Sequence, residues 1–107
     1  MAGGTSSLKS RLTRLGFPNY AEYLRSPHWQ EVRRRYYASK FYKGRCVGCG
    51  CADKPLEIHH RTYRRFGAEK LMDIMALCRE CHQLSHDIEN KGTQLWKATG
   101  KAINKRR

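Results

Sequence analysis

The clearest pattern of hydrophobic and polar positions lies between residues 26 and 44, and it predicts a helix. Between Trp29 and Tyr36, apolar side chains recur every three or four residues, the period of one helix face. Ser26 precedes this stripe as a capping residue, and Pro27 suits the first helical position because no partner is needed there for its missing N–H. We expect this helix to end at Gly44.

Shorter patterns are present further along the chain. Apolar and polar residues alternate over 56–58, which predicts a short strand leading into His59 and His60. Residues 61–70 are expected to be a loop that turns at Gly67, with a second short strand as the alternative, before an apolar segment over 71–77. A further helix is expected from Arg79 to Asn90, where Gly92 ends it. Residues 8–15 are amphipathic, and residues 19–24 predict a brief helical turn.

These elements divide the chain into three parts. Residues 1–18 are expected to be a flexible basic leader, residues 19–92 a folded domain, and residues 93–107 either a basic C-terminal arm or a loosely docked helix, anchored by Trp96. The longest apolar run, from Ile74 to Cys78, is far shorter than a membrane span of roughly 20 residues. The first ten residues lack the apolar stretch of a secretory signal. We therefore expect a cytoplasmic protein without a membrane partner.

Charge adds a candidate ligand class. The 107-residue chain carries 22 Lys and Arg against 9 acids, a net charge of +13, and the excess lies in the flanks. The net charge is +8 over 1–45, +1 over 46–86 and +4 over 87–107. Basic flanks around a nearly neutral centre favour nucleic acid as the partner. The alternative is a solvated surface on which charge only maintains solubility.

Two cysteine pairs predict a zinc site. Cys46 and Cys49, and again Cys78 and Cys81, are separated by two residues, the spacing that directs both thiolates of a pair to one tetrahedral ion. Four thiolates leave no open position, so this site is structural. Cys51 is the remaining thiol, and we expect it to stay outside the site. The alternative is a set of ordinary buried or redox-active thiols.

Four histidines lie around these pairs. His82 and His86 stand four residues apart on the expected helix, so both imidazoles can bind one divalent ion. His59 and His60 are adjacent on an extended segment and point to opposite sides, so only one of them can join that ion. The alternative is that these histidines only support the fold.

The order of these residues resembles a known family. The run Leu56-Glu57-Ile58-His59-His60, with residues 73–82 and His86 after it and the first cysteine pair before it, resembles the zinc-binding branch of the HNH endonucleases. It is similar to small bacterial and phage HNH proteins over about residues 20–90. The resemblance implies a small α+β fold: a ββα-metal core held by a structural zinc on four cysteines, with an N-terminal basic helix and a basic C-terminal tail.

The resemblance also implies residue roles. His59, His82 and His86 would bind a catalytic divalent ion, namely Mg²⁺, Mn²⁺, Ni²⁺, Co²⁺ or Zn²⁺. His60 would be the general base. Asp73 stands where the family usually has Asn, and it would fix the loop, join the metal ligands or lower the activity. The expected activity is metal-dependent hydrolysis of phosphodiester bonds in DNA.

Arginines near the histidines are candidate nucleic-acid contacts. Arg61, Arg64 and Arg65 come directly after the histidine pair and could position the substrate backbone, whereas Arg33 and Arg34 would add a general electrostatic track. The resemblance implies double-stranded DNA as the partner, nicked by a monomer or weak homodimer in the cytoplasm of a bacterium or a phage-infected host. The alternatives are a zinc-finger nucleic-acid-binding module and a degenerate HNH domain, both without cleavage activity.

Overall fold

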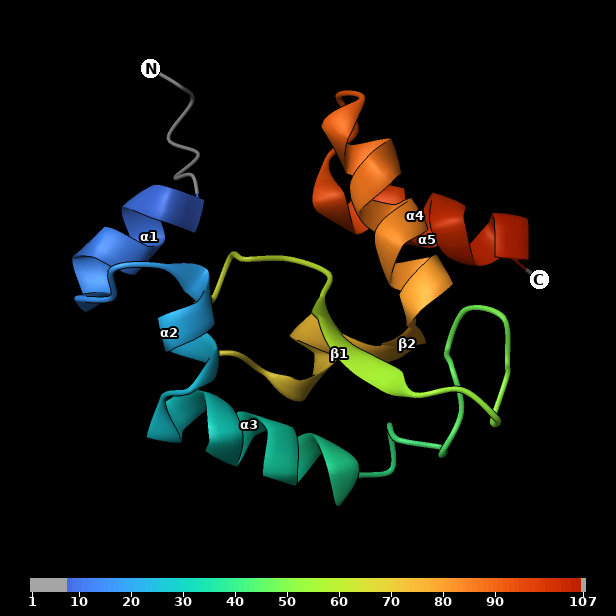
Figure 1. Cartoon of the computed structure of the whole chain (residues 1–107), viewed down its shortest axis with the longest axis horizontal. Coiled ribbons are helices and arrows are strands. Elements are labelled where there is room, and N and C mark those ends of the chain that lie inside the picture. Colours follow the sequence, from blue (N-terminus) through green and yellow to red (C-terminus); the bar gives the residue numbers. More distant parts are fainter. Residues whose placement is uncertain (1–7, 107) are drawn as a thin grey trace.

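Two antiparallel strands lie between helices on both sides in the computed structural model, which describes residues 8–106 (Figure 1). The elements of this part of the chain are α1 (Leu8–Leu15), α2 (Tyr20–Leu24), α3 (Pro27–Tyr37), β1 (Leu56–His60), the 3-10 turn η1 (Leu71–Asp73), β2 (Ile74–Cys78), α4 (Arg79–Asn90) and α5 (Leu95–Arg106). None of these helices has both the length and the apolar character needed to cross a membrane. The small α+β class expected from the sequence is confirmed.

Strand pairing gives the sheet two chemically different faces. β1 and β2 pair with His60 opposite Ile74. Because successive strand side chains point to opposite sides, Glu57 and His59 share one face while Ile58 and His60 share the other. The adjacent histidines are therefore separated by the sheet itself.

The face that carries Ile58 and His60, called the first face below, is covered by α1, α2 and α3. Its buried core contains Leu12, Tyr23, Trp29, Val32, Tyr36, Phe66, Ile74 and Ala76. Tyr36 also serves as a polar link, because its hydroxyl accepts the backbone N–H of Ala76 at 3.0 Å. This contact fastens α3 to β2 and satisfies a buried amide.

The face that carries Glu57 and His59, called the second face below, is covered by α4 and α5. Met75 and Leu77 of β2 are buried on this side among the cysteines. Along α5, Ala98, Thr99 and Ala102 have no exposed surface, and the helix packs along α4. Small side chains at these positions let α5 lie close to its neighbour.

The sequence prediction for α3 is confirmed at its start and wrong at its end. Ser26 caps the helix by accepting the backbone N–H of Trp29. The helix ends at Tyr37 rather than Gly44 because Ser39 interrupts it: the Ser39 hydroxyl donates to the Tyr36 carbonyl and accepts the backbone N–H of residue 41. The predicted bounds of α4 are confirmed. Residues 61–70 form the expected loop and contain no strand, and the second strand, β2, comes from the apolar segment that follows.

Both flanks of the predicted domain are helical in the part of the chain that the structure describes. Of the predicted leader, residues 1–7 lie outside the described residues, but residues 8–15 form α1, in which Leu12 is buried in the first core. The predicted C-terminal arm forms the docked helix α5 from Leu95 onward. In each case an amphipathic pattern next to dense positive charge is enough to bury one helix face.

Replacing Tyr36 with Phe should lower the free energy of unfolding by about 1–3 kcal/mol, because the buried Ala76 amide loses its acceptor. Urea denaturation measured by circular dichroism tests this. The neighbouring Tyr37→Phe, at a 37% exposed side chain, is the matched control and should change stability little. Equal stability of the two variants would contradict a stabilising role for the Tyr36 hydroxyl.

Candidate metal centres

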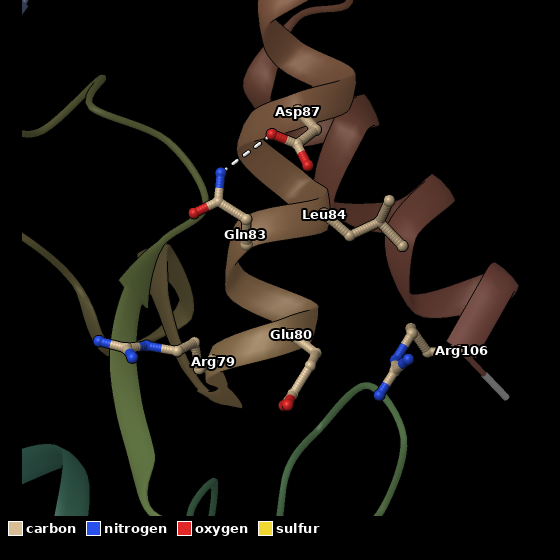
Figure 2. Close-up of a pocket in the computed structure, with 6 residues that line it drawn as sticks. All are labelled: Arg79, Glu80, Gln83, Leu84, Asp87 and Arg106. Carbon is tan, nitrogen blue, oxygen red and sulfur yellow. Dashed lines mark hydrogen bonds between the residues drawn. The ribbon is translucent and has the colours of Figure 1, made fainter.

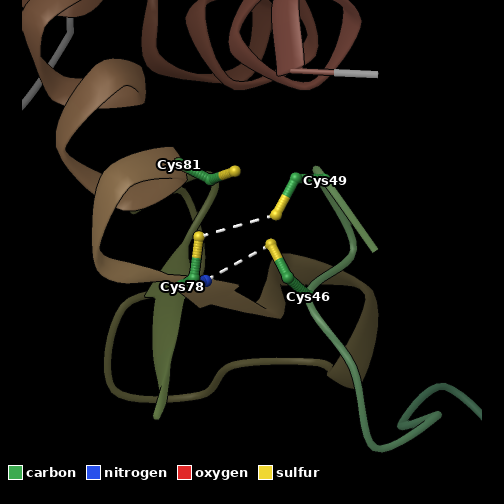
Figure 3. Close-up of side chains that lie close together, drawn as sticks. All are labelled: Cys46, Cys49, Cys78 and Cys81. Carbon is green, nitrogen blue, oxygen red and sulfur yellow. Dashed lines mark hydrogen bonds between the residues drawn. The ribbon is translucent and has the colours of Figure 1, made fainter. Parts of the chain in front are cut away.

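Four cysteines from three parts of the fold converge to form the cysteine cluster, defined as Cys46, Cys49, Cys78 and Cys81 (Figure 3). The first pair lies in the loop before β1, Cys78 ends β2, and Cys81 lies in the first turn of α4. Thiolates around a tetrahedral Zn²⁺ stand roughly 3.8 Å apart when Zn–S bonds are about 2.3 Å. The sulfur atoms of Cys49 and Cys78 are 3.8 Å apart. The cluster can therefore hold a structural metal such as zinc.

The backbone around the cluster is shaped to support thiolates. The amides of Gly48 and Cys78 each donate to the Cys46 sulfur at 3.3 Å. A Cβ atom on Gly48 would lie 2.7 Å from the Cys81 sulfur, so only glycine fits there. The loop carrying the first pair is thus held close to the start of α4.

The remaining thiol behaves differently from its neighbours. A hydrogen bond from the backbone of Cys51 lowers the pKa of Cys49 to about 6, which favours the thiolate that binds metals. Partial burial raises the pKa of Cys51 to about 12 and keeps it protonated at neutral pH. Cys51 lies outside the cysteine cluster, as its sequence spacing predicts.

Arg106 brings positive charge to the cysteine cluster. The Arg106 pKa is raised by its hydrogen bond to Cys81 and by its electrostatic interaction with that sulfur. Its side chain also borders a hollow beside the start of α4, together with Arg79, Glu80, Gln83, Leu84 and Asp87 (Figure 2). The end of α5 therefore partly offsets the negative charge of four thiolates.

Replacing Cys78 with Ser should abolish the cooperative unfolding transition, because a fully buried ligand is lost and zinc binding is coupled to folding in small domains. Zinc content by atomic absorption and thermal melting by circular dichroism test this. Cys51→Ser is the matched control and should retain both zinc and the transition. An unchanged melting temperature in zinc-free Cys78→Ser would contradict a structural zinc.

Three imidazoles converge on the second face of the sheet and form the histidine cluster, defined as His59, His82 and His86. His59 comes from β1, while the other two lie one helical turn apart on α4. The ring centroids are 4.8 Å apart for His59 and His82, 5.2 Å for His59 and His86, and 5.0 Å for His82 and His86. One ring nitrogen from each lies within 4.8 Å of the others, so the three residues predicted as ligands are brought together.

Carboxylates orient the two helical imidazoles. His82 donates through Nδ1–H to Glu57 at 2.8 Å, and His86 donates through Nδ1–H to Glu89 at 3.0 Å. In each neutral ring the proton on Nδ1 leaves the lone pair on Nε2. Such an outer acceptor is typical of histidines that bind metals, because it fixes both tautomer and ring orientation.

His59 is the buried member of the histidine cluster. Its Nε2 is hydrogen-bonded to the hydroxyl of Thr99 at 2.9 Å, while Nδ1 is buried with no hydrogen-bond partner. Burial lowers the His59 pKa to about 2, with further lowering by the neighbouring His82 and His86. The ring is neutral at physiological pH, which is the form that binds metals. An orphaned nitrogen beside two other imidazoles is where a divalent ion fits.

A hollow of about 220 Å³ opens at the exposed side of the histidine cluster. Its lining is Glu57, Arg79, His82, Gln83 and His86. Arg79 was not among the residues predicted from the sequence, although it stands three residues before His82 and therefore shares its helix face. This helical spacing indicates that Arg79 lies beside His82. In the same way, the position of Glu57 two residues before His59 on one strand indicates that Glu57 lies on the same sheet face.

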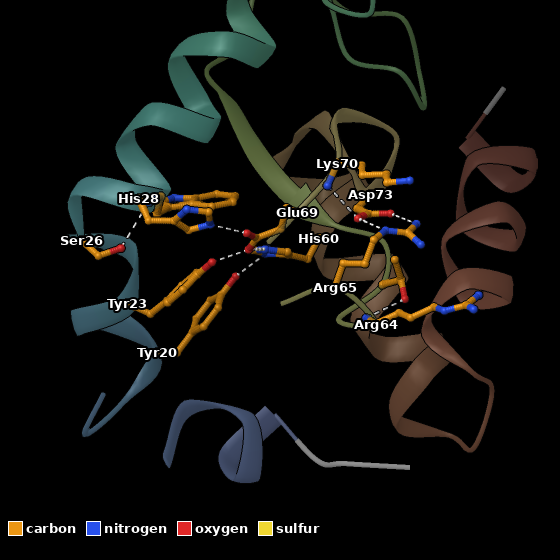
Figure 4. Close-up of polar contacts among 12 residues, drawn as sticks. Tyr20, Tyr23, Ser26, His28, His60, Arg64, Arg65, Glu69, Lys70 and Asp73 are labelled. Carbon is orange, nitrogen blue, oxygen red and sulfur yellow. Dashed lines mark hydrogen bonds and ion pairs between the residues drawn. The ribbon is translucent and has the colours of Figure 1, made fainter. Parts of the chain in front are cut away.

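His60, the predicted general base, is not a member of the histidine cluster and lies instead beside Tyr20 and Glu69 (Figure 4). Its ring is on the opposite sheet face, 2% exposed, and stacks on Trp29 with centroids 4.6 Å apart. Nε2–H donates to Glu69 at 2.8 Å, while Nδ1 accepts the hydroxyl of Tyr20 at 2.9 Å. The alternation of side chains along β1 explains why His60 and His59 lie on opposite faces of the sheet. On the face of His60, α2 and α3 cover the ring.

Glu69 is the centre of this buried polar group. It accepts hydrogen bonds from His60, from the Tyr23 hydroxyl and from His28 Nε2–H, the last at 2.7 Å. Burial alone would raise the Glu69 pKa, but these bonds outweigh it and lower the pKa to about 2. The carboxylate therefore stays charged inside the fold.

This lowered pKa predicts acid sensitivity. The ionised Glu69 contributes to the free energy of unfolding at pH values above its ordinary pKa of about 4.5. This contribution is lost as the pH falls towards 2, because the unfolded chain binds the proton more readily than the folded chain. Urea denaturation at pH 6, 4 and 3 should show a decline that is steeper for the wild type than for Glu69→Gln. Parallel pH profiles would show that Glu69 does not contribute to acid unfolding.

Asp73 fixes the loop and lies outside the histidine cluster. Its buried carboxylate accepts two hydrogen bonds from the guanidinium of Arg65 and one from the Lys70 amide at 2.9 Å. Burial opposes ionisation, but these bonds and the Arg65 charge hold its pKa below the usual range. Arg65 is therefore committed to Asp73, and its predicted contact with a substrate backbone is not supported.

The other predicted arginines have varied surroundings. The Arg61 guanidinium lies 3.8 Å from the centre of the Trp96 ring, and its Nε is buried with no hydrogen-bond partner. Arg64 is exposed, whereas Arg34 pairs with Glu31 at 2.6 Å on the outer face of α3. Arg33 donates to the neighbouring Gln30 side chain at 3.1 Å.

Comparisons with known proteins give no relative. No family model, curated protein or solved structure matches the chain. Conclusions about its chemistry therefore depend on the two clusters and their surroundings.

Proposed function

We propose that this chain is a metal-dependent DNA endonuclease of the HNH type. The observation that carries the proposal is the histidine cluster, in which imidazoles from β1 and α4 converge and one nitrogen of each ring is hydrogen-bonded to an outer oxygen. Three protein ligands leave coordination positions open for substrate and water, unlike four thiolates. The resemblance of the histidine and cysteine order to HNH endonucleases supports the same conclusion.

In this proposal each ligand has a defined task. His59, His82 and His86 hold one divalent ion, with imidazole favouring Zn²⁺, Ni²⁺, Co²⁺ or Mn²⁺ over Mg²⁺. The bound ion supplies Lewis-acid stabilisation of a scissile phosphate and a water of lowered pKa. Glu57 and Glu89 keep the helical imidazoles oriented towards that position.

Positive side chains around the histidine cluster suit a phosphodiester backbone. Arg79 lines the hollow beside His82 and His86, and 86% of its side chain is exposed. Arg61 projects from the end of β1 on the same side as His59, by strand alternation. These guanidinium groups would receive the phosphates next to the ion, while the basic flanks attract DNA over a longer range.

The burial of His60 favours a second candidate function, a nucleic-acid-binding module that does not cut. Both nitrogens of this ring are engaged by Tyr20 and Glu69, so it is not free to take a proton from an attacking water. In this alternative the cysteine cluster and the histidine cluster are both structural. Cleavage assays distinguish the two.

His86→Ala should reduce nicking of supercoiled plasmid by roughly 10²-fold or more, because one of three ligands is lost and ion-derived stabilisation amounts to several kcal/mol. The assay compares Mn²⁺, Mg²⁺, Ni²⁺, Co²⁺ and Zn²⁺, with gel shift in metal-free buffer to confirm that DNA binding is retained. Asn90→Ala, an exposed change on the same helix, is the matched control. A wild type that binds plasmid but cuts it with none of these ions would contradict the endonuclease and favour the binding module.

A further inference from the structure

Helix α5 reaches the metal side of the sheet through two residues. Thr99 contacts His59, and Trp96, one turn earlier, lies against Arg61. His59 and Arg61 are two residues apart on β1 and the residue that follows it, so their side chains point to the same side. One face of α5 therefore packs against one face of this strand. The C-terminal helix is thus in direct contact with the candidate site.

The contact with His59 is isolated from solvent. Thr99 and His59 both have no exposed surface, and the bond between Nε2 and the Thr99 hydroxyl measures 2.9 Å. Water therefore cannot take the place of the hydroxyl. Loss of this partner would leave a second unsatisfied nitrogen on a buried ring whose Nδ1 already has none.

The direction of this bond decides which nitrogen is available to a metal. When Nε2 carries the proton and donates it to Thr99, the lone pair is on Nδ1, the buried ring nitrogen that has no other partner. When Nδ1 carries the proton instead, a buried N–H is left without an acceptor, which is costly. Thr99 therefore favours the metal-binding tautomer of His59.

We propose that Thr99 is a positioning residue for the histidine cluster, which makes helix α5 part of the metal site. Thr99 does not touch the ion. It accepts Nε2–H, holds the ring orientation and leaves Nδ1 as the ligand atom of His59. This inference rests on the metal site of the proposed function, but not on DNA cleavage.

A metal-binding experiment tests the proposal without any activity assay. Protein whose cysteine cluster is loaded with zinc is titrated with Co²⁺, and the visible d–d absorption reports binding at the histidine cluster. Thr99→Val keeps the side-chain shape but removes the hydroxyl, and should weaken Co²⁺ binding by about 10- to 100-fold. Thr99→Ser restores the hydroxyl and should bind within a few-fold of the wild type.

The matched control is Thr93→Val, the same chemical change just before α5. It should leave Co²⁺ affinity unchanged, and thermal melting of all variants reports whether they fold. Equal Co²⁺ affinity of folded Thr99→Val and wild type would overturn the positioning role. Weak binding by both the Val and Ser variants would also overturn it, because packing rather than the hydroxyl would then be responsible.

A second measurement uses the wild type and so does not depend on a folded variant. Long-range ¹H–¹⁵N spectra of imidazole nitrogens during zinc titration should show His59 coordinating through Nδ1 while Nε2 keeps its proton. Coordination through Nε2 would overturn the inference. If zinc binds through Nδ1 but plasmid stays intact, the proposed endonuclease fails while the role of Thr99 stands.

Discussion

The convergence of four thiols is the interaction on which the remaining architecture depends. It joins the loop before β1 to the junction of β2 and α4, two segments about 30 residues apart in the sequence. The Gly48 backbone lies against the Cys81 sulfur at a distance that no side chain permits. By fixing where α4 leaves the sheet, the cysteine cluster also fixes where the imidazoles of that helix point.

The two-stranded sheet then divides the chemistry of the chain. One face presents Glu57 and His59 to α4 and α5, where ring nitrogens gather with oxygen partners behind them. The opposite face presents His60 to a core of aromatic rings and a buried carboxylate. Adjacent residues thus occupy unlike environments: one ring has an orphaned nitrogen and the other has both nitrogens satisfied. The hydrogen bond between His60 and Glu69 is by itself enough to explain why this histidine is buried.

Much of this arrangement can be predicted from short-range patterns. Cysteine spacing, the helical interval between His82 and His86 and the alternation at His59 were enough to predict which residues meet, because each depends on local geometry. Contacts that no sequence motif marks were not predictable. The acceptors at Glu69 and Thr99 lie 9 and 40 residues from their histidines, and nothing local marks them. The ion pair of Arg65 with Asp73 was likewise not predictable, because it depends on how the loop between them closes.

Cys81 and His82 are consecutive residues, and this adjacency couples the two clusters mechanically. Each residue added to an α-helix rotates all later residues of that helix by about 100°. One residue inserted between them would leave every thiol in place yet rotate both helical imidazoles away from His59, whereas lengthening the loop over 61–70 leaves their rotational phase untouched. The direction of both imidazoles therefore depends on the number of residues in the first two turns of α4 and not on the length of that loop.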